Sequence, residues 1–262
     1  MSALLEIEGL STHIRVRRGE VVALDRLDLE LERGETLGLI GESGCGKTMI
    51  ALSIMQLLPK GAFVAHGSIR LEGQELLGLP ESRMRAIRGA EIGVIFQDAT
   101  AALNPTMTVG DQIAEGIAAH HRLSRREAIG RACAALEAVG VSDPRRISGA
   151  YPHQLSGGTR QRVLISLATA CEPRLLVADE PTSALDPALA EQVMGVLQAV
   201  KQRMGLSLLV LTHDPAVVAG WADRVVCMRA GRVVPSDLGT EARGADPIPT
   251  NHRLPPSAWG LS

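Results

Sequence analysis

Aromatic side chains and long apolar segments are both scarce in this sequence. Only 2% of the 262 residues are aromatic, so few side chains are available to stack on a flat ligand. The most apolar stretch, residues 163–178, is interrupted by two charged residues and a proline at 172–174, and such a stretch is too short and too polar to span a bilayer. Residues 1–10 show no apolar run of the kind found in secretory signals. If the protein works at a membrane, another chain must therefore supply the spanning helices.

Charge of one sign is not in excess either. The formal net charge is -2, whereas a dedicated nucleic-acid binder usually has a strong basic excess, so no nucleic-acid partner is expected. The cysteines lie far apart and lack the close pairing that is typical of metal sites; they are Cys45, Cys133, Cys171 and Cys227. We interpret them as reduced thiols, which favours a cytosolic location.

Two kinds of strand pattern are present. Within residues 4–31, Leu27, Leu29 and Leu31 alternate with acidic residues, which is typical of an antiparallel sheet with one solvated face. Further along the chain, short apolar runs alternate with helical patterns, as parallel βαβ units require; the runs cover residues 36–40, 92–96, 175–178, 208–212 and 224–228. A helix is expected over about 47–58, directly after the first run. The chain is therefore predicted to be an α/β protein.

Helical patterns predominate between about residues 98 and 159. Ser124 and Glu127 form a capping-box pattern that predicts the start of a helix, whose apolar face includes Ala132 and Leu136. We interpret this segment as a helical subdomain, residues 97–160, inserted into a domain that spans residues 1–234. Residues 235–262 are rich in Pro, Gly and Asp without periodicity and are expected to form a loosely ordered tail.

A glycine-rich segment lies between the first parallel strand and its helix. It matches the phosphate-binding pattern G-x-x-x-x-G-K-[ST] through Gly41, Glu42, Ser43, Gly44, Cys45, Gly46, Lys47 and Thr48. The glycines let backbone N–H groups approach phosphate oxygens, and the helix N-terminus adds the positive end of its dipole. Lys47 is expected to reach the β- and γ-phosphates of ATP, and the Thr48 hydroxyl is expected to ligate Mg²⁺.

Two acids follow the apolar run at 175–178. Asp179 and Glu180 stand at the end of a buried strand, where carboxylates are costly unless they meet a cation or a reacting group. Asp179 is predicted to hold Mg²⁺, and Glu180 is predicted to polarise the water that attacks the γ-phosphate. These motifs by themselves indicate a P-loop nucleoside triphosphatase.

The segment Leu155-Ser156-Gly157-Gly158-Thr159 lies between these motifs and resembles the signature of ABC ATPases. The resemblance implies that the amides of Ser156, Gly157 and Gly158 bind the γ-phosphate held by a second subunit. A turn of small residues that opens a helix is physically suited to this task.

Three further elements agree with the ABC family. The resemblance implies that Gln97, which follows the 92–96 strand, contacts Mg²⁺ and the attacking water; without the family pattern, Gln97 would be interpreted as a polar strand-end residue. Residues 183–186 resemble the D-loop, which crosses between subunits. His213 follows the 208–212 strand and resembles the switch histidine that touches the γ-phosphate.

The resemblance covers residues 4–234 and is closest to the importer ATPases for peptides and nickel, notably at 38–44 and 151–158. It implies a P-loop NTPase (RecA-like) core, an antiparallel β subdomain and an inserted helical subdomain that receives a coupling helix of an integral membrane permease. The implied partners are permease subunits, a second ATPase subunit, and indirectly an external solute-binding protein. The second ATPase is either an identical copy or a related chain. The expected location is peripheral, on the cytoplasmic face of the plasma membrane.

The sequence also departs from the family. The region in which relatives carry an aromatic residue against adenine contains His13 and Ile14 instead, and one of these is expected to cover the base. An alternative to the importer is the ATPase of a soluble complex, such as the one that breaks down phosphonates. The transported solute is not encoded in this chain, because permeases and binding proteins select it.

Overall fold

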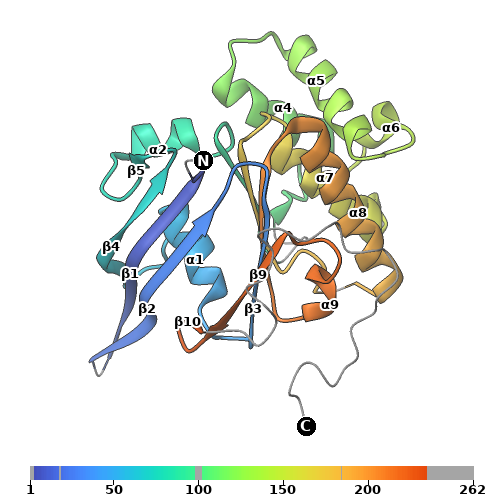
Figure 1. Ribbon diagram of the computed structural model, residues 1–262. Helices are drawn as coiled ribbons and strands as arrows, with labels where there is room; N and C mark the ends of the chain where they lie inside the picture. Colours follow the sequence, from blue (N-terminus) through green and yellow to red (C-terminus); the bar gives the residue numbers. More distant parts are fainter. Residues whose placement is uncertain (1–2, 18, 98–101, 184, 235–262) are drawn as a thin grey trace.

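The computed structural model describes residues 3–17, 19–97, 102–183 and 185–234. Figure 1 shows two sheets side by side, with α1 between them and a group of helices on the far side of the larger sheet. The predicted tail at 235–262 lies outside the described residues. In the described part of the chain, no helix is both long enough and apolar enough to cross a membrane.

The smaller sheet is antiparallel and has the order β2-β1-β4-β5. Its strands are β1 Leu5–Val16, β2 Gly19–Leu31, β4 Ala62–Leu71 and β5 Gln74–Glu75. Leu27, Leu29 and Leu31 are buried, while the acidic residues between them are exposed. The alternation gives one buried and one solvated face, as the sequence predicted, and the leucines pack in the same cluster as α1.

The larger sheet has the order β10-β9-β3-β8-β7-β6, and all its neighbouring pairs are parallel except β9 with β10. Its strands are β3 Thr36–Gly41, β6 Ile92–Ile95, β7 Leu175–Asp179, β8 Ser207–Thr212, β9 Arg224–Arg229 and β10 Arg232–Val234. Each apolar run that the sequence assigned to a parallel strand is a strand of this sheet. The strands are apolar on both faces because both faces are covered.

Helices cover the two faces of the larger sheet. The described ones are α1 Lys47–Ile54, α2 Glu81–Ile87, α4 Val109–His120, α5 Arg125–Ala138, α6 Pro144–Ser148, α7 Gly157–Thr169, α8 Pro187–Met204 and α9 Pro215–Val218, with a 3-10 turn at Pro152–Gln154. The Ser124 capping box opens α5 as predicted, since the Ser124 hydroxyl and the Glu127 carboxylate each accept a backbone N–H. The expected boundary at residue 160 falls inside α7, which continues without a break to Thr169.

The sheet separates two hydrophobic clusters. On one face, Val177 and Leu209 pack with Ile50 and Ile54 of α1 and with the smaller sheet. On the other face, Ala178 and Val210 pack with α4, α5, α7 and α8. Successive strand residues therefore serve different cores, which fixes the register of each strand.

The helix after the glycine-rich segment is shorter than expected. It ends at Ile54 rather than near Leu58, and Gln56 has a left-handed φ of 48°. The Arg88 side chain donates a hydrogen bond to the Met55 carbonyl at 2.8 Å. This distant guanidinium satisfies a carbonyl at the helix end, so the stop depends on tertiary structure rather than on local sequence.

Candidate active site

The glycine-rich segment connects β3, in the interior of the sheet, to α1. Gly46 has a φ of 112°, and a Cβ atom at this position would lie 2.6 Å from the Ala23 carbonyl oxygen. Gly44 has a φ of 81° but faces open space. No side chain caps the N-terminus of α1, so its first N–H groups stay free of side-chain acceptors. The segment therefore has the backbone shape of an anion-binding loop.

Cys45 differs from its neighbours in the loop in the burial of its side chain. Cys45 is buried, and its sulfur lies close to the backbone of Gly41 and near Met228. Glu42, Ser43 and Gly44 are exposed. The loop thus presents its backbone to the outside and anchors itself through the Cys45 side chain.

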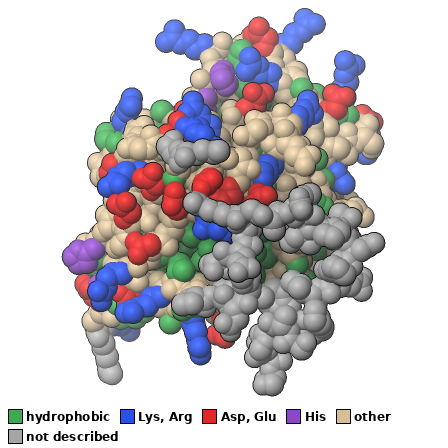
Figure 2. Space-filling model, viewed as in Figure 1, with side chains coloured by type: hydrophobic (Ala, Val, Ile, Leu, Met, Phe, Trp, Pro, Cys, Tyr) green, Lys and Arg blue, Asp and Glu red, His purple; other side chains and the backbone are tan. Residues whose placement is uncertain are grey.

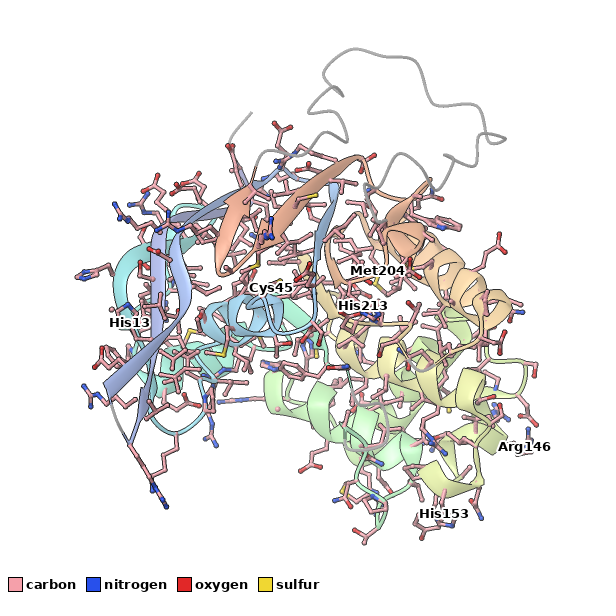
Figure 3. All side chains as sticks on the ribbon, turned by 90° about the horizontal axis from the view of Figure 1, so that it is seen from below. His13, Cys45, Arg146, His153, Met204 and His213 are labelled. Atoms are coloured by element: carbon pink, nitrogen blue, oxygen red, sulfur yellow. The ribbon has the colours of Figure 1, made fainter. Side chains whose placement is uncertain are left out.

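Lys47, Glu180 and His213 meet at the carboxyl edge of the parallel sheet. The Lys47 ammonium donates to the carbonyls of Gly41 and Glu42 at 2.6 and 3.1 Å and lies 3.5 Å from a Glu180 carboxylate oxygen. The His213 Nδ1 atom lies 2.9 Å from both Glu180 oxygens. Figure 3 shows His213 and Cys45 near the middle of the molecule, where the ends of β3, β7 and β8 converge. Two positive or polar donors therefore flank one buried carboxylate.

Asp179 is the second acid of the site and is more deeply buried than Glu180. Asp179 is 1% exposed, and within the described chain its Oδ1 atom has no hydrogen-bond partner. Burial raises the pKa of the Asp179 carboxyl; a hydrogen bond from Thr48 opposes the shift, the charge of Glu180 adds to it, and Lys47 opposes it. An unpaired buried carboxylate oxygen beside an exposed threonine hydroxyl is chemically suited to a hard cation.

The Glu180 backbone is in an uncommon conformation. Its φ is 52°, in the left-handed region that residues other than glycine rarely adopt. Its N–H donates to the Leu211 carbonyl at 2.8 Å, and its carboxylate accepts a hydrogen bond from the Thr212 hydroxyl at 3.4 Å. The neighbouring strand β8 thus holds both the backbone and the side chain of Glu180, which explains how the strained conformation persists.

Gln97 follows β6 at the same edge. β6 pairs with β7 through Ile95 and Ala178, so the ends of the two strands are adjacent. Gln97 is exposed, two residues beyond Ile95. Its location is compatible with the predicted contact to a bound nucleotide.

The predicted signature residues lie elsewhere on the surface. Ser156 caps α7, accepting a hydrogen bond from the Thr159 N–H, and both Ser156 and Gly157 are exposed. In the described structure α7 packs mainly against α4, α5, α8 and β6, whereas α1 packs mainly against β2, β7 and β8. The chain therefore does not bring its own signature residues onto its own glycine-rich loop.

His13 and Ile14 lie in β1, outside the group around Lys47. Figure 3 shows His13 on the outer part of the smaller sheet, away from Cys45 and His213. The His13 ring contacts the Glu20 carboxylate at 3.2 Å and also the ring of Phe63, which lies directly opposite on the neighbouring strand β4. Phe63 lies 50 positions from His13 in the sequence and comes beside it only through the pairing of β1 with β4, so the sequence pattern along β1 did not indicate it.

Two other polar residues near Glu180 were not predicted. Thr212 directly precedes His213, so its location at a strand end was a signal in the sequence. Gln161 in α7 is buried and donates to the Pro181 carbonyl at 2.7 Å. No pattern in the sequence indicated that Gln161 contacts Pro181.

Comparisons with known proteins agree with this geometry. The oligopeptide transport ATP-binding protein OppD of Bacillus subtilis is 41% identical over 262 residues, covering 100% of this chain and 71% of its own length. A Brucella abortus protein whose name describes peptide import ATP binding is 46% identical over 239 residues, covering 89% of this chain and 71% of its own length.

A solved structure gives the same result for the fold. The dimeric structure of MJ0796, a bacterial ABC transporter cassette, matches with a TM-score of 0.78 and 27% identity, covering 88% of this chain and 97% of that chain. A second structure of that cassette is described as a post-hydrolysis state bound to ADP and Pi. Residues 24–183 match the model of the ABC transporter family. The chain therefore belongs to the ABC transporter family, as one of its ATP-binding and ATP-hydrolysing subunits.

Proposed function

We propose that this subunit powers a bacterial importer of peptides, nickel or a related small solute. The observation that carries the ATPase mechanism is the meeting of Lys47, Glu180 and His213 at the end of the glycine-rich loop. The import role is supported by the relatives, whose names refer to peptide import and oligopeptide transport. These names favour import over the alternative, a soluble complex such as phosphonate breakdown.

The residues of the loop bind the triphosphate. Backbone N–H groups of Gly41–Thr48 face the phosphates, and Lys47 neutralises charge on the β- and γ-phosphates. Lys47 already has acceptors at Gly41, Glu42 and Glu180, so a phosphate oxygen replaces the longest of these contacts, the one to Glu180 at 3.5 Å. Phosphate binding then leaves Glu180 free to act on water.

A magnesium ion fits beside Asp179. The unpaired, buried Asp179 oxygen and the exposed Thr48 hydroxyl are the protein ligands that suit it, and Gln97 is a third candidate. When bound, Mg²⁺ offsets the negative charge on the phosphates.

Glu180 and His213 act on the reacting groups. Glu180 orients the attacking water and accepts its proton, and the hydrogen bond from Thr212 helps to hold its carboxylate. His213 is half exposed, at 52% of its side chain, so its outer ring nitrogen is accessible to a γ-phosphate oxygen while Nδ1 stays on Glu180. This division of roles places proton transfer and charge stabilisation on different residues.

A second ATPase subunit completes each site. Ser156 and Gly157 are exposed and Gly158 is half-buried at the start of a helix, and in the proposal these three residues bind the γ-phosphate held by the other subunit. Whether that subunit is an identical copy or a related chain, a lone chain lacks these donors at its own phosphates. We therefore expect slow hydrolysis by the isolated chain.

The helical subdomain couples the ATPase to permease subunits in the membrane. A surface pocket of about 630 Å³ opens between α4 and α5, with Thr106, Met107, Ala118, Leu123 and Tyr151 among its lining residues. This mixed polar and apolar groove suits a short helix of a permease. On the face drawn in Figure 2, acidic and basic side chains are interspersed. In this arrangement the subunit is peripheral on the cytoplasmic side, and an external solute-binding protein acts only through the permease.

The test of the ATPase mechanism is Glu180→Gln in the complete assembly with its permease and partner ATPase. Glutamine keeps the shape of the side chain but does not accept a proton, so we expect turnover to fall by roughly 100-fold or more, with ATP binding retained. Glu30→Gln, an exposed change in β2, serves as the control and should leave turnover unchanged. Full activity in Glu180→Gln would exclude the general-base role.

The test of the import role is an affinity purification from gently solubilised membranes, followed by mass spectrometry. Two integral membrane proteins and a related or identical ATPase should be recovered. Recovery of soluble partners alone would leave the ATPase chemistry intact and reject the importer.

A further inference from the structure

Gln161 makes a buried contact that the mechanism above does not use. It lies in α7, five positions after Ser156, and its residue is 6% exposed. Its side-chain amide donates to the carbonyl of Pro181 at 2.7 Å, and Pro181 directly follows Glu180. One hydrogen bond therefore joins the helix that carries the signature residues to the turn that carries the catalytic carboxylate.

The turn at Glu180 depends on such contacts. Glu180 has a left-handed φ of 52°, a conformation that costs about 1–3 kcal/mol and persists only when its surroundings hold it. On the side of β8, Leu211 and Thr212 bind the Glu180 backbone and side chain. On the opposite side, Gln161 binds the carbonyl of the next residue. The carboxylate is thus fixed between a strand and the signature helix.

The link from Ser156 to Gln161 is short and stiff. α7 is continuous from Gly157 to Thr169, with Ser156 as its N-cap, so the two residues lie about one and a half turns apart. Gly158 packs closely on Leu189 of α8, and Figure 1 shows the two helices side by side. A displacement of the signature residues therefore moves the first turns of α7 together, and Gln161 moves with them.

We propose that Gln161 is a positioning residue that ties the placement of Glu180 to the signature helix of the same chain. The proposal rests on the proposed function, in which Ser156–Gly158 contact the γ-phosphate held by the second subunit. When those residues engage that phosphate, Gln161 sets the Glu180 turn in its productive position. The state of one nucleotide site thereby controls the base of the other.

The first variant is Gln161→Met in the complete assembly, where methionine keeps the length of the side chain but removes the donor. A misplaced catalytic group costs about 10- to 100-fold in rate, so kcat should fall by roughly this factor, with KM for ATP changed less than about twofold.

The matched control is Gln198→Met. Gln198 in α8 also donates a side-chain hydrogen bond of 2.7 Å to a backbone carbonyl, that of Trp221, and its described hydrogen bonds go to Trp221 and Thr36 rather than to the site residues. Gln198→Met should leave kcat within about twofold of the wild type, although it removes this hydrogen bond and a second one, of 3.2 Å, to the Thr36 hydroxyl.

The second variant is Gln161→Glu, which separates positioning from packing within one sample. An ionised carboxylate cannot donate to the Pro181 carbonyl, whereas a protonated one can, and burial favours the protonated form. The ratio of Gln161→Glu activity to wild-type activity should therefore rise as the pH is lowered from about 8 to about 6. The same ratio for Gln161→Met should not change with pH.

The outcomes distinguish this proposal from the proposed function. A pH-independent ratio for Gln161→Glu, or a kcat for Gln161→Met within twofold of the wild type, overturns the role of Gln161 while Glu180→Gln remains inactive. If Glu180→Gln itself keeps full activity, the mechanism on which the proposal rests is wrong. Loss of kcat in Gln161→Met, together with recovery of Gln161→Glu at low pH, supports it.

Discussion

Lys47 and Glu180 form a buried ion pair, and removing the lysine alone should destabilise the fold. The exposed fraction of their side chains is 5% and 9%, and their charged atoms lie 3.5 Å apart. Methionine at position 47 keeps the aliphatic volume but removes the charge. The Glu180 carboxylate then remains buried, and within the described residues His213 and Thr212 are its remaining side-chain donors.

The size of the effect follows from these contacts. Breaking a buried ion pair by removing one partner costs about 3–5 kcal/mol when the remaining charge has no other partner. His213 and Thr212 remain bound to Glu180, so we expect Lys47→Met to lower the free energy of unfolding by about 2–3 kcal/mol. In Lys47→Met/Glu180→Gln the side chain at position 180 is no longer charged, and most of that loss should be regained. The coupling free energy between the two changes should be about 1–2 kcal/mol.

The assay is urea denaturation of the four proteins of this cycle, without nucleotide or divalent metal. Lys201→Met supplies a matched control, because Lys201 is also largely buried, at 13% side-chain exposure, but pairs with Asp223 on the other face of the sheet. Lys201→Met and Glu180→Gln should be additive within about 0.5 kcal/mol. Additive effects of Lys47→Met and Glu180→Gln within that same margin would refute the reasoning.

Three further predictions concern the loop, the second acid and a distant helix. Gly46→Ala should abolish ATP binding, because its Cβ would collide with the Ala23 carbonyl. The Cβ of Gly44→Ala would lie in open space, so this change should cost only the backbone strain of a left-handed residue, about 1–2 kcal/mol. Equal ATP affinities of the two variants in a binding titration would contradict this prediction. Burial raises the pKa of Asp179, so its contribution to stability is greatest below its unfolded pKa and is lost as the pH rises through the folded value. Asp179→Asn should therefore stabilise the metal-free chain at pH near 7, by a margin that shrinks toward pH near 4 in urea denaturation, while ATP hydrolysis is lost. Gly130→Ala, in α5 with no atom near its Cβ position, should stabilise the fold by about 1 kcal/mol, and a lower melting temperature would contradict it.

Much of the site was determined by the sequence, because its parts are local. A strand, a glycine-rich turn and a helix follow one another in 36–54, so this loop needs no distant residue to be identified. Asp179 and His213 each stand at the end of a parallel strand. Carboxyl ends of parallel strands meet at one edge of a sheet, so these two residues lie at the same edge in the structure.

The signature and Gln97 were identified through resemblance to a family rather than from physical pattern alone. Their sequence positions agree with the structure, which places Gln97 beside the end of β7 and Ser156 at the start of α7. Their roles toward nucleotide remain predictions. The contribution of a second subunit is likewise a property of the assembly, and the folding of one chain does not determine it.

Tertiary structure alone decided the remaining features. Arg88 binds a carbonyl at the end of α1, and the His13 ring contacts Phe63 of the neighbouring strand. Gln161 binds the Pro181 carbonyl. Each of these pairs joins residues that are distant in sequence and carry no shared pattern. Sequence periodicity specifies which face of an element is buried, because that is a local property. Which side chain meets which carbonyl is fixed only when the two sheets and the helices pack together.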